Sequence, residues 1–314
     1  YLGIHPRFAD STNIGGSAFA AHVAHAAMAI EYGYCDVALI VYGSTQRSER
    51  SRTLGGRPST LTMQYENVWG IPQPVGGYAL AAKRHMHEHG TTQEQLAEIA
   101  VATRKWAALN PHATKRDLID IDDVMASMPI SDPLKLLDCC LVTDGAGAVV
   151  MTSADNAKAH GASAVNVRGF GEAHTHWSIS AMPDLARLTA AEMSGKTAFE
   201  MAGVTHDAID LVECYDSFTI TVLMTLEALG FCKRGEGGEF VSNQRTAPGG
   251  PFPMNTNGGG LSYGHPGMYG IFLLIEAVRQ LRGEAGEHQV AGVETALVHG
   301  TGGTLSSGST VILS

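Results

Sequence analysis

Apolar residues recur at helical spacing in several parts of this chain. Residues 92–107 and 267–282 both show this spacing, and each stretch predicts an amphipathic helix. In the second stretch the apolar positions are Ile271, Leu274, Ile275 and Val278. An alanine-rich stretch over residues 18–32 predicts a further helix, which Gly33 ends.

Apolar runs between these helices predict strands. Residues 37–41 are apolar without interruption, the pattern of a parallel strand that is buried on both faces. We expect a second buried strand at residues 295–298. Further strands are predicted at residues 144–152, 164–167, 210–212 and 309–313. Because strands alternate with helices, the chain is expected to be an α/β protein with mostly parallel sheets and right-handed crossovers.

One succession of elements occurs twice in the chain. A glycine turn, a helix, a buried strand and a final strand follow one another over residues 13–152 and again over residues 257–313, which predicts a duplicated α/β unit. We place an N-terminal half at residues 1–155 and a C-terminal half at residues 156–314, separated by a short polar segment that ends in glycine. Residues 44–140, which are polar and contain Gly and Pro, predict a subdomain inserted into the first half.

Composition narrows the choice of partners. A chain of 314 residues with 44% hydrophobic residues can bury a sizeable core in one large or two similar domains. The formal net charge of −10 disfavours nucleic acid and anionic membrane surfaces as partners. No apolar run approaches the ~20 residues of a membrane span, and no signal peptide is recognised at the start.

The cysteines indicate the compartment. There are five, an odd number, and two are adjacent at Cys139 and Cys140. This pattern is neither a secreted disulfide framework nor a CxxC zinc site, so we expect no bound metal and a reducing cytosol. The sequence begins abruptly at Tyr1, just before the first glycine turn, and we expect an N-terminal portion to precede it.

Residues 255–270, NTNGGGLSYGHPGMYG, carry the strongest chemical signal. The glycines at 258–260 leave the backbone free to take positive φ and to approach a ligand. They precede His265, which is held in a GHPG turn before Pro266. A histidine in a turn is more often solvated or packed than catalytic. However, a glycine triplet followed by GHPxxxG and a helix resembles the C-terminal signature of the thiolase superfamily, in which the corresponding histidine is catalytic.

The resemblance covers nearly the whole chain, including the DGAGAV strand and the QLRGEAG helix end at residues 280–286. It implies the thiolase fold, in which two related halves form a five-layered αβαβα sandwich, and normally a homodimer. The chain is most similar to the sterol-carrier or lipid-transfer branch, several members of which lack the nucleophilic cysteine. Some members of that branch are aldolases that cleave a side chain from a steroid acyl-CoA with catalytic tyrosines, beside a small OB-fold and zinc-ribbon partner.

The first family motif has no thiol in this chain. Thiolases place a nucleophilic cysteine at the start of the helix after the first glycine turn, where the helix N-terminus lowers the thiol pKa. The corresponding position is Gly16, followed by Ser17. Ser17 has no evident general base beside it, and we interpret it as a helix N-cap rather than as a nucleophile. Ordinary acyl-cysteine chemistry is therefore not expected.

The second family motif, an Asn-Glu-Ala-Phe or His-Glu-Ala-Phe box, corresponds to ECYDSF at residues 213–218. Tyr215 stands in place of the Asn or His. Its hydroxyl can donate to a thioester carbonyl or exchange a proton with a substrate oxygen, and the alternative is a packed aromatic ring that caps a carbonyl. The resemblance implies that Asp216 orients the loop. Cys214 is expected to be a small buried hydrophobic residue.

The third family motif is a strand-end Cys-x-Gly-Gly-Gly turn whose cysteine serves as acid and base. It corresponds to HGTGG at residues 299–303, so that His299 replaces the thiol. A histidine can shuttle protons near neutral pH without being a good carbon nucleophile. We therefore expect His299 to retain the proton-transfer function.

Glycine turns can aim backbone N–H groups at a developing negative charge. We expect Gly302 or Gly303, together with Gly16 or Ser17, to form such an oxyanion hole. Tyr263 is a further phenol in the turn before the GHP histidine, and its side chain faces either the site, the dimer or solvent.

The leading functional hypothesis follows from which catalytic groups of the family the chain retains and which it lacks. Enolate chemistry needs carbonyl polarisation and proton transfer, and both are retained, whereas Claisen transfer through an acyl-enzyme needs the missing nucleophile. We expect retro-aldol cleavage of a β-hydroxyacyl-CoA, with the coenzyme A thioester as substrate and no cofactor. Tyr215 or His299 would take the β-hydroxyl proton, while the glycine amides and His265 stabilise the enolate.

Two alternatives stay open. One is a thiolase-type acyl-CoA acyltransferase in which Ser17 or another residue is an atypical nucleophile. The other is a non-catalytic acyl-CoA or lipid-binding subunit that scaffolds a partner. Such a subunit would have no evident need for His265 and His299. The chain also departs from the aldolases in one respect. Tyr215 matches one of their tyrosines, but the place of the second, near the glycine turn, holds the histidine of GHP.

Overall fold

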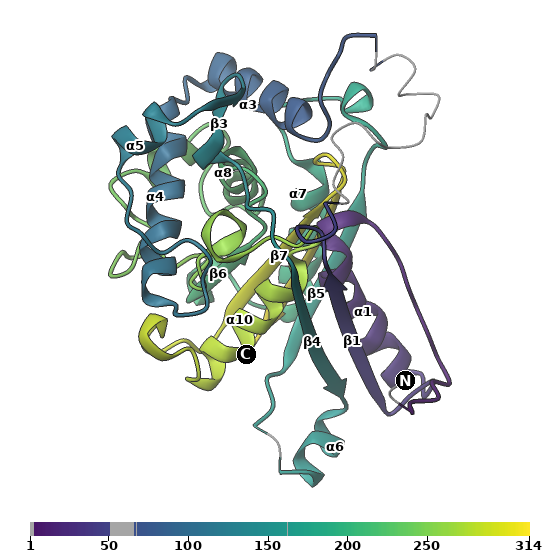
Figure 1. Cartoon of the computed structure of the whole chain (residues 1–314). Coiled ribbons are helices and arrows are strands. Elements are labelled where there is room, and N and C mark those ends of the chain that lie inside the picture. The colour runs from purple at the N-terminus through teal and green to yellow at the C-terminus, as the bar shows by residue number, and fades with distance from the viewer. Residues whose placement is uncertain (1–2, 51–65, 67, 162) are drawn as a thin grey trace.

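The structure is a computed structural model that describes residues 3–50, 66, 68–161 and 163–314 (Figure 1). Its strands are β1 (Val37–Ser44), β2 (Pro129–Ser131), β3 (Leu134–Lys135), β4 (Gly145–Thr152), β5 (Val167–His174), β6 (Leu211–Cys214), β7 (Ala296–Gly302) and β8 (Ser307–Leu313). Its α-helices are α1 (Ala18–Glu31), α3 (Val75–His89), α4 (Gln93–Leu109), α5 (Ile121–Ala126), α6 (Ala154–Ala159), α7 (Thr189–Ala202), α8 (Thr219–Ala228), α9 (Gly237–Val241) and α10 (Gly270–Arg282). Two short helical turns precede helices that matter for function: η1 (Gly15–Ser17) before α1, and η5 (Gly259–Tyr263) before α10.

The larger sheet has the strand order β5-β8-β7-β6. Only β6 and β7 are parallel, while β8 is antiparallel to both of its neighbours. The prediction of mostly parallel sheets is therefore wrong. The short connection between β7 and β8 explains the difference, because residues 303–306 are too few for the crossover that parallel strands require.

Strands β1 and β4 form a separate antiparallel pair, with Val37 opposite Thr152 and Ser44 opposite Gly145. The prediction of a buried parallel strand at residues 37–41 is also wrong, since the side chains of Val37 and Val41 are 52% and 62% exposed. Among the strands that the structure describes, β1 pairs only with β4. An apolar run contains no information about pairing direction, which depends on how the chain returns to the sheet.

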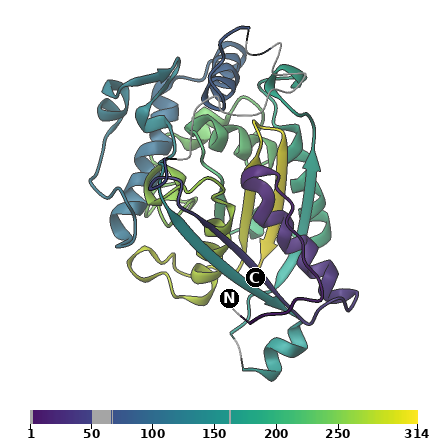
Figure 2. The same ribbon diagram turned by 45° about the vertical axis from the view of Figure 1, so that its right-hand side comes forward.

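The elements are stacked in the order helix, sheet, helix, sheet (Figures 1 and 2). Helix α7 covers the outer face of the larger sheet against β5 and β8. Helices α1 and α10 lie against the opposite face and also contact the β1–β4 pair. Buried apolar residues form one cluster on each face of the larger sheet. This stacking corresponds to four of the five layers of the predicted αβαβα sandwich.

The two halves share an order of elements. In the first, η1, α1, β1 and β4 follow one another, and in the second η5, α10, β7 and β8 do so. In both halves the last two strands pair antiparallel. The predicted boundary at residues 155 and 156 falls inside α6, and the division into halves stays a prediction.

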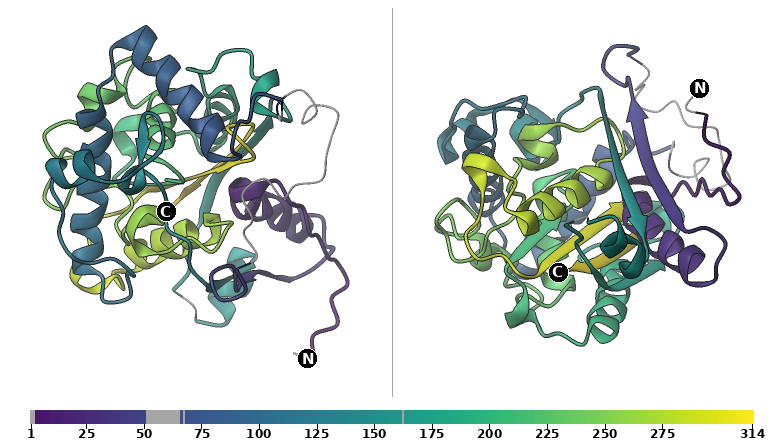
Figure 3. Two further views of the ribbon diagram at one scale, coloured as in Figure 1. Left: turned by 45° about the horizontal axis from the view of Figure 1, so that its top comes forward. Right: turned by 90° about the horizontal axis from the view of Figure 1, so that it is seen from below.

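The predicted insertion at residues 44–140 contains α3, α4, α5 and the β2–β3 pair, which lie at the opposite end of the molecule from the N-terminal segment (Figure 3). Helix α4 begins with a capping box, in which the Thr92 hydroxyl accepts from the Gln95 amide. It packs against α8, α9 and the glycine turn η5. Within the insertion, residues 51–65 and 67 lie outside the described residues. Helix α4 thus supports the turn that leads to His265.

Candidate active site

A cavity of about 820 Å³ lies where η1, the end of β6, the end of β7 and the GHPG turn meet. Four of the predicted site residues line it: Gly16, Tyr215, His265 and Gly303. Gly16 lies near the start of the chain, and the other three residues come from its second half. The fold therefore brings one member of each family motif to a single cavity.

Tyr215 follows β6, and its hydroxyl oxygen has three polar neighbours. The oxygen lies 2.7 Å from His265 Nε2, 3.1 Å from the Gly267 carbonyl and 3.2 Å from the Tyr269 amide nitrogen. The Tyr269 N–H donates to it, so the phenol O–H is left to donate either to the imidazole or to the Gly267 carbonyl. Tyr269 is the N-cap of α10, and this helix end favours negative charge on the phenol oxygen.

His265 is held on three sides. Its backbone N–H donates to Thr143 Oγ1 at 2.9 Å, and its carbonyl accepts from the Thr143 amide at 3.2 Å. Its ring stacks on Tyr269, with centroids 6.2 Å apart and planes at 22°, and meets the Tyr215 ring edge-on at 5.5 Å. The residue is 2% exposed. These contacts fix the imidazole in line with the Tyr215 hydroxyl.

Gly16 lies directly against the Tyr215 ring. A Cβ atom placed on Gly16 would lie 2.1 Å from Cε2 and 2.4 Å from Cζ of Tyr215, and 2.5 Å from the Thr301 carbonyl oxygen. The phenol therefore occupies the space into which a side chain at residue 16 would project. Sequence reasoning noted both residues separately and missed this dependence of one on the other.

Ser17 is packed within the protein. It is the N-cap residue of α1, as expected, but its hydroxyl does not cap the helix. It donates to the Ile14 carbonyl at 3.0 Å and lies 2.6 Å from Ser307 Oγ. Its relative exposure is 0%. None of these contacts is to a general base, so the geometry does not favour Ser17 as a nucleophile.

The turn at Gly302 and Gly303 packs closely against η1. A Cβ on Gly15 would lie 2.7 Å from the Gly303 nitrogen, and one on Gly302 would lie 1.8 Å from the Ile14 carbonyl oxygen. Gly16 and Gly303 line the cavity, whereas Ser17 and Gly302 are packed between the two turns. An oxyanion hole built from these backbone amides stays a prediction.

His299 lies within β7 and is fully buried. Its Nδ1 is 2.9 Å from Thr310 Oγ1 on the neighbouring strand β8. Burial lowers the pKa of His299 to about 3, so the imidazole is neutral at physiological pH. Of the described residues of this motif, Thr301 and Gly303 line the cavity and His299 does not. The structure thus does not bring His299 to the place where it was expected to transfer protons.

Asp216 supports the glycine turn. Its carboxylate accepts from the Gly260 amide at 2.6 Å and from the Leu261 amide at 3.1 Å. Burial raises the pKa of Asp216 to about 7, although the two amides act in the opposite direction. Tyr263, at the end of this turn, packs against Phe272 with ring centroids 6.0 Å apart. It does not line the cavity among the described residues.

The cavity wall also contains residues that sequence reasoning did not connect with the site. Tyr78 and Phe218 pack against each other with tilted rings, whose centroids are 4.4 Å apart, and Trp177 also lines the cavity. Cys140 lines the same cavity, so the site contains a thiol that belongs to none of the three family motifs. The adjacent cysteines were interpreted only as evidence about the compartment, because a sequence does not show which side chain of a loop faces a cavity.

Neither a metal centre nor a membrane segment is found in the part of the chain that the structure describes. Within residues 3–50, 66, 68–161 and 163–314, no group of three or more His, Cys, Asp or Glu side chains is arranged to hold a metal ion. Over these same ranges, no helix combines the length and the apolar character that a membrane crossing requires.

A layered α/β fold whose two halves each direct a glycine turn and a helix to one shared cavity defines a protein of the thiolase type. The family model "Thiolase C-terminal domain-like" matches residues 171–314. The acetyl-CoA acetyltransferase of Methanothermobacter thermautotrophicus is 37% identical over 88% of this chain and 72% of that protein. The chain belongs to the thiolase superfamily and to its sterol-carrier and lipid-transfer branch.

Two further relatives match 96% of this chain. The 17-hydroxy-3-oxo-4-pregnene-20-carboxyl-CoA lyase of Mycobacterium tuberculosis is 34% identical over 96% of this chain and 80% of that protein. The solved structure of an Ltp2-ChsH2(DUF35) aldolase superposes with a TM-score of 0.85 at 30% identity, over 96% of this chain and 78% of that chain. The resemblance inferred from the sequence motifs is confirmed, and so is the thiolase fold.

Proposed function

We propose that this protein is a thiolase-like carbon–carbon lyase that cleaves a β-hydroxyacyl-CoA by a retro-aldol reaction. One observation is central to this proposal. The Tyr215 phenol fills the space of a side chain at residue 16 and lies 2.7 Å from His265 Nε2. The site thus has a proton-transfer pair where a thiolase would need a nucleophile. Relatives named as a lyase and as a steroid side-chain-cleaving aldolase support the same reaction class.

The reaction begins with proton transfer from the β-hydroxyl group of the substrate. Tyr215 Oη takes this proton while its own proton passes to His265 Nε2. The bond between the α- and β-carbons then breaks, the β-carbon becomes a ketone or aldehyde, and the electron pair moves to the thioester oxygen as an enolate. In this proposal the backbone amides around Gly16 and Gly303 stabilise the negative charge on this oxygen. The proton then returns from His265 through Tyr215 to the α-carbon, and an acyl-CoA shorter by the carbonyl product is released.

The substrate and the partners belong to the same proposal. The acyl group lies along the Tyr78–Phe218 pair, since aromatic side chains that line a cavity favour an apolar ligand. The enzyme works as a homodimer in the cytoplasm, without a cofactor. The enzyme also works with a small partner protein of the OB-fold and zinc-ribbon kind, and the DUF35 component in the name of the Ltp2-ChsH2 aldolase supports the presence of a partner.

The acyltransferase and the scaffold are less well supported by the same geometry. Ser17 is buried between Ile14 and Ser307, away from a base, which weakens the case for an acyl-serine intermediate. A scaffold would not need the phenol and imidazole to meet inside a cavity. Both alternatives remain as outcomes of the test below.

The test combines purified protein with a series of β-hydroxyacyl-CoA thioesters, with and without a DUF35 partner. Mass spectrometry follows the ketone or aldehyde and the shortened acyl-CoA. Wild type should give both products in equal amounts, whereas Tyr215→Phe should give very little of either. Tyr32→Phe is the matched control, because it removes a hydroxyl that is on the surface, where the residue is 78% exposed. An acyl adduct on the intact protein would instead support the acyltransferase, and tight acyl-CoA binding without any product would support the scaffold.

A further inference from the structure

The backbone after His265 is bridged by a second phenol, Tyr42 of β1. The Tyr42 hydroxyl donates to the Pro266 carbonyl at 2.6 Å and accepts from the Met268 amide, which lies 3.2 Å away. It thereby joins a carbonyl to the amide two residues further along the chain. None of the three family motifs includes Tyr42.

The catalytic phenol makes the same kind of bridge one residue later. Tyr215 Oη lies 3.1 Å from the Gly267 carbonyl and 3.2 Å from the Tyr269 amide. Residues 266–269 are therefore bonded by two phenols, Tyr42 and Tyr215, and the contacts of the second are offset by one residue from those of the first. A shift of the backbone at one phenol must change the geometry at the other, because they share consecutive peptide units.

The turn needs such partners for a local reason. Gly267 has φ +111°, and the amides of Met268 and Tyr269 come just before α10, where they have no carbonyl of an earlier helical turn to bond. The two phenols supply acceptors for both amides. The Tyr42 oxygen would lie 3.1 Å from a Cβ on Gly267, so it packs directly against the glycine backbone.

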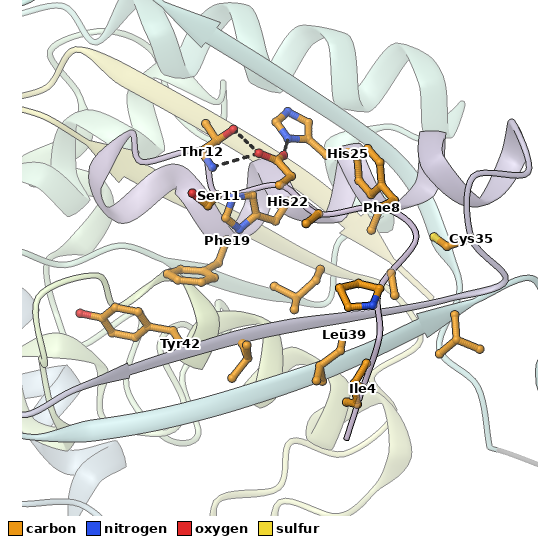
Figure 4. A pocket seen from close by; sticks show the side chains of 18 of the residues that line it. Ile4, Phe8, Ser11, Thr12, Phe19, His22, His25, Cys35, Leu39 and Tyr42 are labelled. Atoms are coloured by element: carbon orange, nitrogen blue, oxygen red, sulfur yellow. Dashed lines mark hydrogen bonds and ion pairs between the residues drawn. The ribbon is translucent and has the colours of Figure 1, made fainter. Parts of the chain in front are cut away.

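Tyr42 approaches from the side opposite the catalytic cavity. Gly267 lines the catalytic cavity, whereas Tyr42 and Met268 line a second cavity of about 850 Å³ beside α1 and β1. Figure 4 shows the Tyr42 ring at one end of this second cavity, next to Phe19, and the two ring centroids are 5.0 Å apart. The turn is thus the wall between two cavities, with one phenol on each side.

We propose that Tyr42 is a positioning residue for the Tyr215–His265 pair. It makes no contact with the cavity in which the reaction takes place, and it acts by fixing the peptide units that the Tyr215 hydroxyl contacts. Without its hydroxyl, the Pro266 carbonyl and the Met268 amide lose their partner, and the spacing between the phenol and the imidazole is no longer fixed. The effect on turnover rests on the proposed function, whereas the effect on the His265 ring does not.

The first experiment measures the geometry without any substrate. Protein labelled with ¹³C at the histidine rings is prepared as wild type, Tyr42→Phe and the surface control Tyr32→Phe, and the His265 signal is assigned from its disappearance in His265→Gln. Tyr42→Phe should shift the His265 signal, and Tyr32→Phe should leave it unchanged. The Met268 amide should exchange with deuterium faster in Tyr42→Phe by roughly fivefold, since one hydrogen bond is lost.

The second experiment measures turnover with the β-hydroxyacyl-CoA that wild type cleaves. Tyr42→Phe should lower kcat by roughly tenfold to a hundredfold, as expected for a misplaced catalytic pair, with KM changed by less than about twofold. In a Tyr215→Phe background the same change should have little further effect on kcat, because the group that Tyr42 positions is already gone.

Two results would overturn the proposal. One is an unchanged His265 signal together with unchanged Met268 exchange in folded Tyr42→Phe protein. The other is an equal loss of kcat from Tyr42→Phe with and without the Tyr215 hydroxyl, which indicates a general structural role. If wild type shows no lyase activity at all, the proposed function fails, and the resonance and exchange measurements still decide the role of Tyr42.

Discussion

The amino ends of α1 and α10 occupy equivalent places in the two halves of the chain, yet only the end of α10 carries a reactive pair. At α1, the turn Gly15–Ser17 is packed against the β7–β8 turn, and its one hydroxyl is bonded to Ile14 and Ser307. At α10, a phenol and an imidazole meet beside the first amides of the helix. The absence of a side chain at Gly16 gives the phenol of the other half its space. The reactive pair at the start of α10 thus depends on the lack of a side chain at Gly16, at the start of α1.

The largest effect is expected from removing the pair itself. Tyr215→Phe keeps the ring against Gly16 and removes only the hydroxyl, so folding should hardly change. Turnover should fall by roughly 10²- to 10⁴-fold, the usual contribution of general acid–base catalysis, and His265→Ala should do likewise. The double variant should lose less than the two separate losses combined, since the residues act as a unit. Steady-state kinetics beside thermal melts measure this, and full activity of Tyr215→Phe would remove the tyrosine from the mechanism.

A side chain at Gly16 should have the next largest effect. Gly16→Ala places a methyl group 2.1 Å from the Tyr215 ring, so the ring must shift and its spacing from His265 should change. We expect turnover to fall by roughly 10²-fold, as for a displacement of about 1 Å. Gly43→Ala is the control, because its Cβ meets Ala146 at an ordinary 3.5 Å. An active Gly16→Ala protein would show that the two helix ends are independent.

The pH dependence of the unfolding free energy should show how much Asp216 contributes to the turn before α10. Burial raises the pKa of Asp216 from 3.8 to about 7, so this group favours the folded state below about pH 4, and its contribution is lost as pH rises towards and through 7. Relative to Asp216→Asn, wild type should lose on the order of 4 kcal/mol of unfolding free energy between pH 4 and pH 8. Denaturant titrations at both pH values measure it. Equal losses in the two proteins would place the titration elsewhere.

The smallest effect is expected at His299. Its ring is neutral, buried and bonded to Thr310, so His299→Asn should change turnover by less than about threefold, although the melting temperature will fall if the hydrogen bond is lost. A loss of turnover comparable with that of Tyr215→Phe would restore His299 as the proton shuttle. It would contradict the finding that His299 does not line the cavity.

Helical periodicity gave reliable predictions because it depends on residues close in sequence. The predicted helices at residues 18–32, 92–107 and 267–282 correspond to α1, α4 and α10 within a few residues. Strand pairing was not predictable in the same way. Whether β1 runs parallel or antiparallel to its neighbour is decided more than 100 residues later, where β4 returns beside it.

The candidate site was predictable where a motif fixes a backbone turn, as at the GHPG turn and the ECYDSF strand end. It was not predictable where a side chain's direction decides its role. His299 follows the family's third motif in sequence but is buried against β8, while Thr301, two residues later, reaches the cavity. Tyr42 comes directly after the apolar strand that was predicted at residues 37–41, and Cys140 lies in a loop with no motif. Their contacts depend on the packing of one half against the other.

The close fit between Gly16 and Tyr215 has a consequence for how the reaction could change in evolution. A cysteine acquired at residue 16 first would collide with the phenol, and a smaller residue acquired at 215 first would lack the hydroxyl before any nucleophile was present. Either order passes through an impaired protein. The two ways of handling an acyl-CoA are therefore separated by a pair of interdependent substitutions, and a lineage that has adopted the tyrosine cannot return to acyl-cysteine chemistry by one mutation at a time without losing function on the way.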